Sequence, residues 1–171
     1  MPDLPDPGFA GDDGAASEEV RAALEAYDAD PSTRQDATLE VLQRSRLLVP
    51  VVALLGEVEH DADGRPQEKT SDMATVLTRG RDGRTALLAF TGTDALRRWD
   101  PEARPVPVTV DRAAQAALQD GAAAIVVDLA GPVMFVVDGE DLQELARGSV
   151  LVRVAEGAGV SGRYGWARPG P

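Results

Sequence analysis

Cysteine is missing from all 171 residues of the chain. Without thiols the chain can form no disulfide, no thiolate nucleophile and no cysteine-ligated zinc or iron–sulfur site. Histidine is almost as scarce, since His60 is the only one, and this excludes every metal site that needs two imidazoles. These absences remove several classes of redox, metal and nucleophilic chemistry.

Long hydrophobic runs are missing as well. The longest run, residues 47–55 (LLVPVVALL), is far shorter than the roughly 20 residues of a membrane helix. The first 13 residues are acidic and lack the apolar stretch of a secretory signal. A net charge of -12 repels phosphate backbones and anionic lipid, which disfavours nucleic acid and membranes as partners. We therefore expect an acidic, cytoplasmic protein.

The remaining composition is that of one globular domain with weak ends. Hydrophobic residues make up 43% and charged residues 27%, which is enough apolar surface for a core. Residues 1–16 combine prolines, glycines and aspartates, so their burial cannot offset the entropy of ordering them. Residues 155–171 are rich in glycine. We predict a disordered N-terminus (1–16), a folded domain (17–154) and a flexible tail (155–171).

Two helices are expected at the start of the domain. Ser17 precedes apolar residues at helical spacing, and Asp30-Pro31 ends that helix because the residue before proline avoids helical angles. Ser32 and Gln35 have the spacing of a capping box, which predicts a second helix to about residue 44.

Strands and further helices follow. Residues 47–55 predict a buried strand, with Pro50 placing it at an edge or a bulge. Hairpins are expected from 73–79 with 85–90 around Asp82-Gly83, and from 123–127 with 133–137. Residues 106–110 and 150–154 predict two more strands, and helices are expected after Thr91, Asp111 and Asp138. The fold class is α/β (α+β): a single domain with a mixed β-sheet and flanking helices.

Three stretches together resemble a known family. They are residues 47–55, residues 85–99 (TALLAFTGTDALRRW) and residues 122–146 (AAAIVVDLAGPVMFVVDGEDLQELA). In this order they resemble the N-terminal domain of the SseB family, in its actinobacterial type, over about residues 39–147. The resemblance implies the fold and a non-enzymatic role, with no cofactor. The family takes its name from a serine-sensitivity phenotype, which hints at a domain that senses an amino acid.

No constellation of catalytic or metal-binding residues is evident. His60 lies in a polar stretch with Glu57, Glu59, Asp61 and Asp63, which could supply oxygen ligands, but the calcium-loop pattern is incomplete. We favour a solvated loop there. Ser71 is near His60 in sequence, yet no serine lies in a nucleophile-elbow motif. We therefore expect no enzyme activity and no catalytic, cofactor-binding or metal-binding residues.

Two carboxylates at strand ends have structural explanations. Asp128 and Asp138 end successive strands of one expected hairpin, so they should point to opposite ends of it and not share a substrate. Asp138 is expected to cap a helix and Asp128 to lie in a turn.

Protein-interaction residues are expected at two places. The candidates are Arg97, Arg98, Trp99 and Arg104 near one helix end, and Tyr164 and Trp166 on the tail. Trp99 either packs on the core, which we favour, or lies exposed beside the arginines. The tail either anchors a partner or only packs loosely. The leading hypothesis is a non-catalytic module that binds an unidentified protein partner; the alternative is a small-molecule sensor that modulates amino-acid metabolism.

Overall fold

The computed structural model describes residues 9–54, 59–60, 66–67, 72–154 and 162–170. It contains helices at both expected positions before the first long strand and at each of the three expected positions after it. They are α1 (Glu18–Ala29), α2 (Pro31–Leu42), α3 (Thr93–Trp99), α4 (Val110–Gln119) and α5 (Gly139–Ala146). Every helix among the described residues is too short or too polar to cross a bilayer.

The starts of the first two helices differ in how they are capped. Ser17 caps α1 as expected, since its hydroxyl accepts a hydrogen bond from the Val20 amide. The predicted capping box of α2 is wrong. Asp30 precedes that helix and accepts from the Ser32 and Thr33 hydroxyls, while the Gln35 side chain donates to the Val136 carbonyl 3.2 Å away. The Gln35 side chain thus bonds to a strand distant in sequence instead of capping its own helix.

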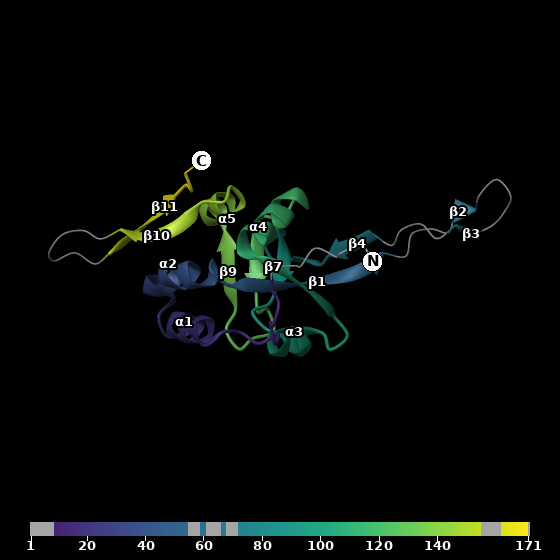
Figure 1. Ribbon diagram of the computed structural model, residues 1–171, viewed down its shortest axis with the longest axis horizontal. Helices are drawn as coiled ribbons and strands as arrows, with labels where there is room; N and C mark the ends of the chain where they lie inside the picture. Colours follow the sequence, from purple (N-terminus) through teal and green to yellow (C-terminus); the bar gives the residue numbers. More distant parts are fainter. Residues whose placement is uncertain (1–8, 55–58, 61–65, 68–71, 155–161, 171) are drawn as a thin grey trace.

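The strands form a mixed sheet arrangement (Figure 1). One sheet has the order β4-β1-β7 and another the order β5-β6-β8-β9, and Leu48 and Phe90 exchange backbone hydrogen bonds that join them. Strands β6 and β8 run parallel, and the other pairs are antiparallel. The bounds are β1 (Arg46–Leu54), β4 (Asp72–Thr75), β5 (Leu77–Arg79), β6 (Thr85–Ala89), β7 (Arg104–Thr109), β8 (Ala124–Val127) and β9 (Phe135–Asp138).

Two short hairpins complete the strands. β2 (Glu59–His60) pairs with β3 (Pro66–Gln67), and β10 (Val150–Val154) pairs with β11 (Arg163–Ala167). The prediction of a single α/β (α+β) domain with a mixed sheet and flanking helices is confirmed, as is the hairpin after Val127. The hairpin around Asp82-Gly83 is confirmed in part: the predicted strand 73–79 is divided, so that β5 pairs with β6 while β4 pairs with β1.

Pro50 does not lie on an edge strand. Strand β1 lies between β4 and β7, so the prediction of an edge is wrong. Pro50 faces Pro105 in a non-hydrogen-bonded pair, because Leu48, two residues earlier, directs its amide away from β7 to Phe90 and the backbone alternates sides. On the other side of β1, Leu48 bonds to Phe90 and pairing with β4 begins only at Val51, so Pro50 falls between two partners.

The core has two unequal parts on opposite faces of the sheet. The larger part lies between the sheet and α1, α2, α4 and α5, with Leu87, Ile125 and Phe135 fully buried at its centre. The smaller part lies under α3 and contains Leu48, Phe90 and a few neighbours. Figure 1 shows α4 and α5 on one side of the strands and α3 on the other. The short helix α3 does not cover the edge of the sheet that lies next to α1.

Both chain ends are more ordered than composition predicts. From Phe9 onward the N-terminal segment is described, and Thr93 donates to the Gly14 carbonyl at 2.8 Å. Arg163–Ala167 forms β11, so this part of the predicted flexible tail is a strand instead. Each end is fixed by groups in other parts of the chain, and the composition of the end itself does not reveal such contacts. Residues 1–8 and 155–161 lie outside the described residues.

Candidate functional site

A pocket of about 220 Å³ lies at one edge of the sheet, between α1 and α3. Since β6 and β8 are parallel, their carboxyl ends meet at this edge, where ligands of open α/β sheets commonly bind. Thr91 follows β6 and Asp128 follows β8, and both line the pocket. Leu24, Ala95 and Val133 give it an apolar wall.

Asp128 is the buried carboxylate of this pocket, with 1% of its surface exposed. One carboxylate oxygen accepts from the Thr91 amide at 2.8 Å and the other from the Thr91 hydroxyl at 2.7 Å. Its backbone has a φ of 54°, a left-handed conformation that aspartate tolerates better than most residues. The carboxylate is therefore fixed by both ends of Thr91.

The environment of Asp128 disfavours its charge. Burial raises the pKa of this carboxyl, while the two hydrogen bonds from Thr91 and the positive charge of Arg98 act in the opposite direction and only partly offset it. A desolvated ionisable group in a pocket is characteristic of functional sites. A cationic ligand group placed beside Asp128 would favour the ionised form.

Charged side chains of both signs surround the mouth of the pocket. Arg21 and Glu25 project from α1, and Asp94 and Arg98 from α3, and all four are exposed. Within the part of the chain that the structure describes, neither Arg21 nor Arg98 forms a salt bridge. Their guanidinium groups are available to an anion, and the acidic residues to a cation.

The size of the pocket limits what it can hold. Pockets for drug-sized ligands enclose about 300–1,000 Å³. A hollow of about 220 Å³ suits a smaller molecule. The combination of an apolar wall, two arginines and three carboxylates favours a small molecule that carries both a positive and a negative group.

The candidates near the end of α3 have separate positions. Arg97 and Arg98 are exposed, and Arg104 is exposed at the start of β7, opposite Val51. Trp99 is half-buried, with its ring centroid 5.6 Å from that of Phe90, so the packed alternative favoured by the sequence is confirmed. Of these four residues, Arg98 lines the pocket.

Tyr164 and Trp166 lie on β11 and are half-buried. Both pack against the larger core, and Arg153 lies over the Tyr164 ring at 5.6 Å from its centroid. Burial raises the pKa of the Asp141 carboxyl, and the nearby Trp166 side chain acts in the opposite direction. These aromatic rings therefore fix the hairpin to the domain, and their role as partner anchors stays a prediction.

The candidate metal loop cannot be placed. Glu57, Asp61 and Asp63 lie outside the described residues, and of Glu59 and His60 only the backbone, in β2, is described. Among the residues whose side chains are described, no group of three or more histidine, aspartate or glutamate side chains could hold a metal ion.

Asp128 begins a turn, as predicted, since the Gly131 amide donates to its carbonyl at 2.9 Å, but its burial in the pocket was not predicted. The register confirms that Asp128 and Asp138 lie at opposite ends of the β8–β9 hairpin, since Asp138 pairs with Ala124. Asp138 precedes α5 but makes no side-chain cap bond, and Arg84 lies 3.4 Å from it. The usable signal was the polar residue directly after each of the two buried strands, Thr91 and Asp128.

The comparisons with known proteins identify the family. The family model of the SseB protein N-terminal domain matches residues 20–144, which is well over half of the chain. No curated protein and no solved structure gives a match. The match begins earlier than the predicted resemblance at about residue 39, and it includes α1 with Arg21 and Glu25. The chain therefore belongs to the SseB family.

Proposed function

We propose that this SseB-family domain is a non-catalytic module that binds a small zwitterion of the amino-acid class in the pocket between α1 and α3. The observation that carries the proposal is the buried carboxylate of Asp128, which lines a small hollow whose mouth has two arginines without a salt bridge among the described residues. Exposed guanidinium groups can bind an anion, and a desolvated carboxyl in a pocket is characteristic of a functional site.

The charges of the pocket complement those of an α-amino acid. The ammonium group would lie beside Asp128, with Glu25 and Asp94 adding negative potential at the mouth. The carboxylate group would lie against Arg21 and Arg98, because guanidinium binds carboxylate through paired, charge-assisted hydrogen bonds. Leu24 and Val133 would contact an apolar side chain of the ligand.

Binding without bond making is supported by the chemistry of the lining. The Thr91 hydroxyl donates to Asp128 and lies in a buried residue, which is a poor position for a nucleophile. The other described lining side chains are aliphatic, carboxylate or guanidinium groups. Nucleophilic and acid–base catalysis generally requires an activated nucleophile or a titrating base with access to the substrate.

A thermal-shift screen with common L-amino acids, L-serine first, and with nucleotides tests the proposal. A ligand that binds the native state raises the melting temperature by mass action. We expect one or more amino acids to do so and nucleotides to have no effect. A screen in which no amino acid raises the melting temperature at millimolar concentration would contradict the proposal.

Two neighbouring arginines on α3 provide a matched pair of variants for the active amino acid. Arg98→Gln removes a guanidinium from the pocket, whereas Arg97→Gln removes one of equal charge that does not line it. We expect Arg98→Gln to weaken binding about tenfold or more and Arg97→Gln to leave it unchanged. Equal effects of the two variants would show that only the net charge of the surface matters.

A second candidate function is binding of a protein partner through Arg97 and Arg104. Both are exposed cations on a chain of net charge -12, which favours an acidic patch on the partner. A pull-down with the Arg97→Glu/Arg104→Glu double variant tests this surface. Loss of a partner that the Arg79→Glu control still captures would support it, and equal capture by both would refute it.

We also propose that the chain is of the actinobacterial type of the family and that it lies in the cytoplasm. The actinobacterial type of the family follows from the resemblance, and a cytoplasmic location follows from the composition. The absence of cysteine suits a reducing compartment, where disulfides are rare.

A further inference from the structure

Residues 9–16, called the strap here, form part of the wall of the pocket. Ala15 and Ala16 line the pocket beside Thr91 and Gly92. The Thr93 amide donates to the Gly14 carbonyl at 2.8 Å, and a Cβ atom on Gly92 would lie 2.8 Å from the Ala16 nitrogen. Only glycine at position 92 allows the strap to approach this closely.

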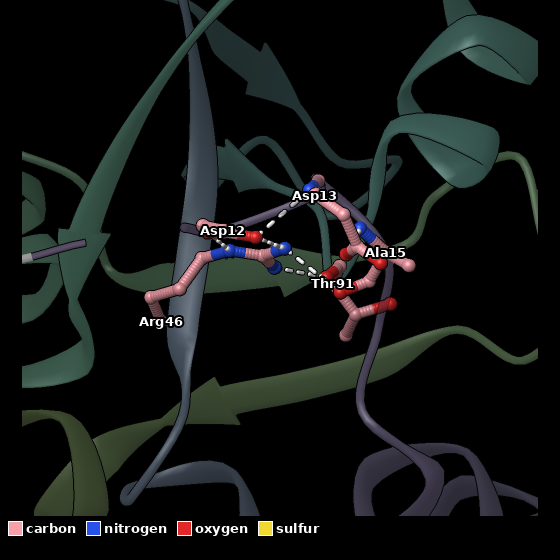
Figure 2. Close-up of polar contacts among 6 residues, drawn as sticks. Asp12, Asp13, Ala15, Arg46 and Thr91 are labelled. Atoms are coloured by element: carbon pink, nitrogen blue, oxygen red, sulfur yellow. Dashed lines mark hydrogen bonds and ion pairs between the residues drawn. The ribbon is translucent and has the colours of Figure 1, made fainter. Parts of the chain in front are cut away.

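One side chain fixes the strap to the sheet. The Arg46 guanidinium, at the start of β1, forms a paired contact with the Asp12 carboxylate, at 2.5 Å from Nε and 2.9 Å from Nη2 (Figure 2). The same guanidinium donates to the Ala15 carbonyl at 2.8 Å and to the Thr91 carbonyl. Only 10% of the Arg46 side chain is exposed, so these partners replace the water that would otherwise solvate its charge.

Thr91 connects this contact to the floor of the pocket. Its carbonyl accepts from Arg46, while its amide and hydroxyl donate to Asp128. Arg46 under the strap and Asp128 in the pocket therefore bind Thr91 from opposite sides. A change in the strap contact is expected to reach the pocket through Thr91.

We propose that the strap is a gate for the pocket and that the Asp12–Arg46 contact is its latch. When the latch opens, Ala15 and Ala16 leave the wall of the pocket and expose Asp128 and Val133 to the solvent. This inference goes beyond the proposed function, because access to the pocket is a property of the chain whether or not an amino acid is its ligand.

The latch is a small attachment compared with the core of the domain. The strap is held mainly by one ion pair and backbone hydrogen bonds, and 22% of the Asp12 side chain is exposed, so water reaches this carboxylate. Separating the pair leaves the largely buried Arg46 without its carboxylate, which costs more than breaking a surface pair but less than exposing the core. Segments with such attachments open locally at far lower free energy than the whole domain unfolds.

The absence of natural cysteine permits a direct test. A Val133→Cys variant places a single thiol in the wall of the pocket, at a residue that is 8% exposed. Its reaction rate with an aromatic disulfide reagent measures how often the pocket opens. An Ala117→Cys variant, with its thiol in the fully buried part of α4, measures global unfolding in the same way.

Two neighbouring aspartates provide the test and its control. Asp12→Asn removes the charge of the latch, and Asp13→Asn makes the same change where the side chain only accepts from the Ala15 amide, which asparagine can also do. We expect Asp12→Asn to speed labelling of the Val133→Cys thiol about tenfold or more, with no change at Ala117→Cys. Asp13→Asn should leave both rates unchanged.

A second pair of variants tests the latch from the side of the sheet. Arg46→Gln should also speed labelling in the pocket, whereas Arg44→Gln, which removes an exposed arginine paired with Glu40 across one helical turn, should not. Arg46→Lys should restore part of the protection, since lysine keeps the charge but not the paired geometry. Unchanged labelling of the pocket thiol in Asp12→Asn and Arg46→Gln would overturn the inference.

These outcomes are separable from those of the proposed function. Labelling is measured without ligand, so it tests the gate alone. If Asp12→Asn speeds labelling but L-serine and the other amino acids protect neither protein, the gate stands and the amino-acid proposal fails. If an amino acid protects the thiol and the latch variants label like the wild type, the pocket assignment stands and the gate fails.

Discussion

The two ends of the described chain are attached to the domain in different ways. The strap at the N-terminal end is held by charges and backbone hydrogen bonds, with Arg46 at the centre. The β10–β11 hairpin at the C-terminal end is held by apolar contact, since Leu151 is buried and Tyr164 and Trp166 pack on the larger core. The first kind of attachment can open locally, and the second opens only at the cost of exposed aromatic surface.

The hairpin also has a polar contact, which is neutral where that of the strap is charged. The amide of the Gln43 side chain, just after α2, donates to the Leu151 carbonyl at 2.6 Å and accepts from the Leu151 amide at 2.8 Å. It thus pairs with β10 much as another strand would. Figure 1 shows the hairpin beside α2.

The comparison shows why composition is a poor guide to order at chain ends. The strap has few large apolar residues, and the tail that supplies β11 is rich in glycine. The strap is fixed by Arg46, and β11 is fixed by pairing with β10, which Gln43 binds in turn. A segment with few apolar residues can be ordered when the rest of the domain supplies its partners.

The largest expected effect is that of Trp166→Ala. The change removes a half-buried ring from the contact between β11 and the core and should lower the free energy of unfolding by about 2 kcal/mol. Urea denaturation measures it, with the exposed Arg168→Ala as the control. A loss no larger than that of the control would mean that the aromatic contact does not fix the hairpin.

Gln43→Ala is expected to have a somewhat smaller effect. It leaves the amide and carbonyl of Leu151 without their partners and should destabilise the domain by about 1 kcal/mol. Gln143→Ala at an exposed position of α5 is the control and should be neutral within about 0.5 kcal/mol. Indistinguishable urea midpoints for the two variants would refute this role of the polar contact.

Asp128→Asn tests the cost of the buried carboxylate in the pocket that the strap covers, because it removes a charge that burial disfavours. The pKa of Asp128 is raised above its ordinary 3.8, so the native state binds its proton more tightly than the unfolded state, and stability falls as pH rises through this interval. The variant should therefore be more stable than the wild type at pH 7, and this advantage should shrink as the pH approaches 3.8. A variant that is less stable at pH 7 would contradict this reasoning.

Acid should release the strap before the hairpin, with the smallest effect on overall stability. Hydrogen bonds from Arg46 lower the pKa of Asp12 below 3.8, so the latch is intact above that value and is lost as the pH falls through the lowered pKa. We expect the amide resonance of Thr93 to shift at acid pH while the indole resonance of Trp166 stays unchanged. Simultaneous shifts would show that the two ends open together.

Local sequence signals predicted most of the fold. Ser17 marked the start of α1, and Asp82-Gly83 marked the turn between β5 and β6, because caps and turns depend on a few adjacent residues. Pro50 misled the strand prediction, since its tolerance depends on where Phe90 and β4 pair with β1, and both are distant in sequence.

The site was harder to predict than the fold. Arg98 was singled out as an exposed cation, but its relation to Arg21 and Asp128 arises only when α1, α3 and the end of β8 come together. Asp128 resembles a turn residue in sequence, and its burial follows from the parallel pairing of β6 with β8. Contacts between distant elements, and not residue types, define this pocket.

The proposed zwitterion specificity is tested most directly by comparing three related ligands in a titration followed by NMR. The active amino acid should shift the amide resonances of Thr91 and Asp128, whereas its N-acetyl derivative, which lacks the ammonium group, and its amide, which lacks the carboxylate, should each bind about tenfold more weakly or worse. Equal affinity for all three ligands, or shifts confined to residues outside the pocket, would contradict the assignment.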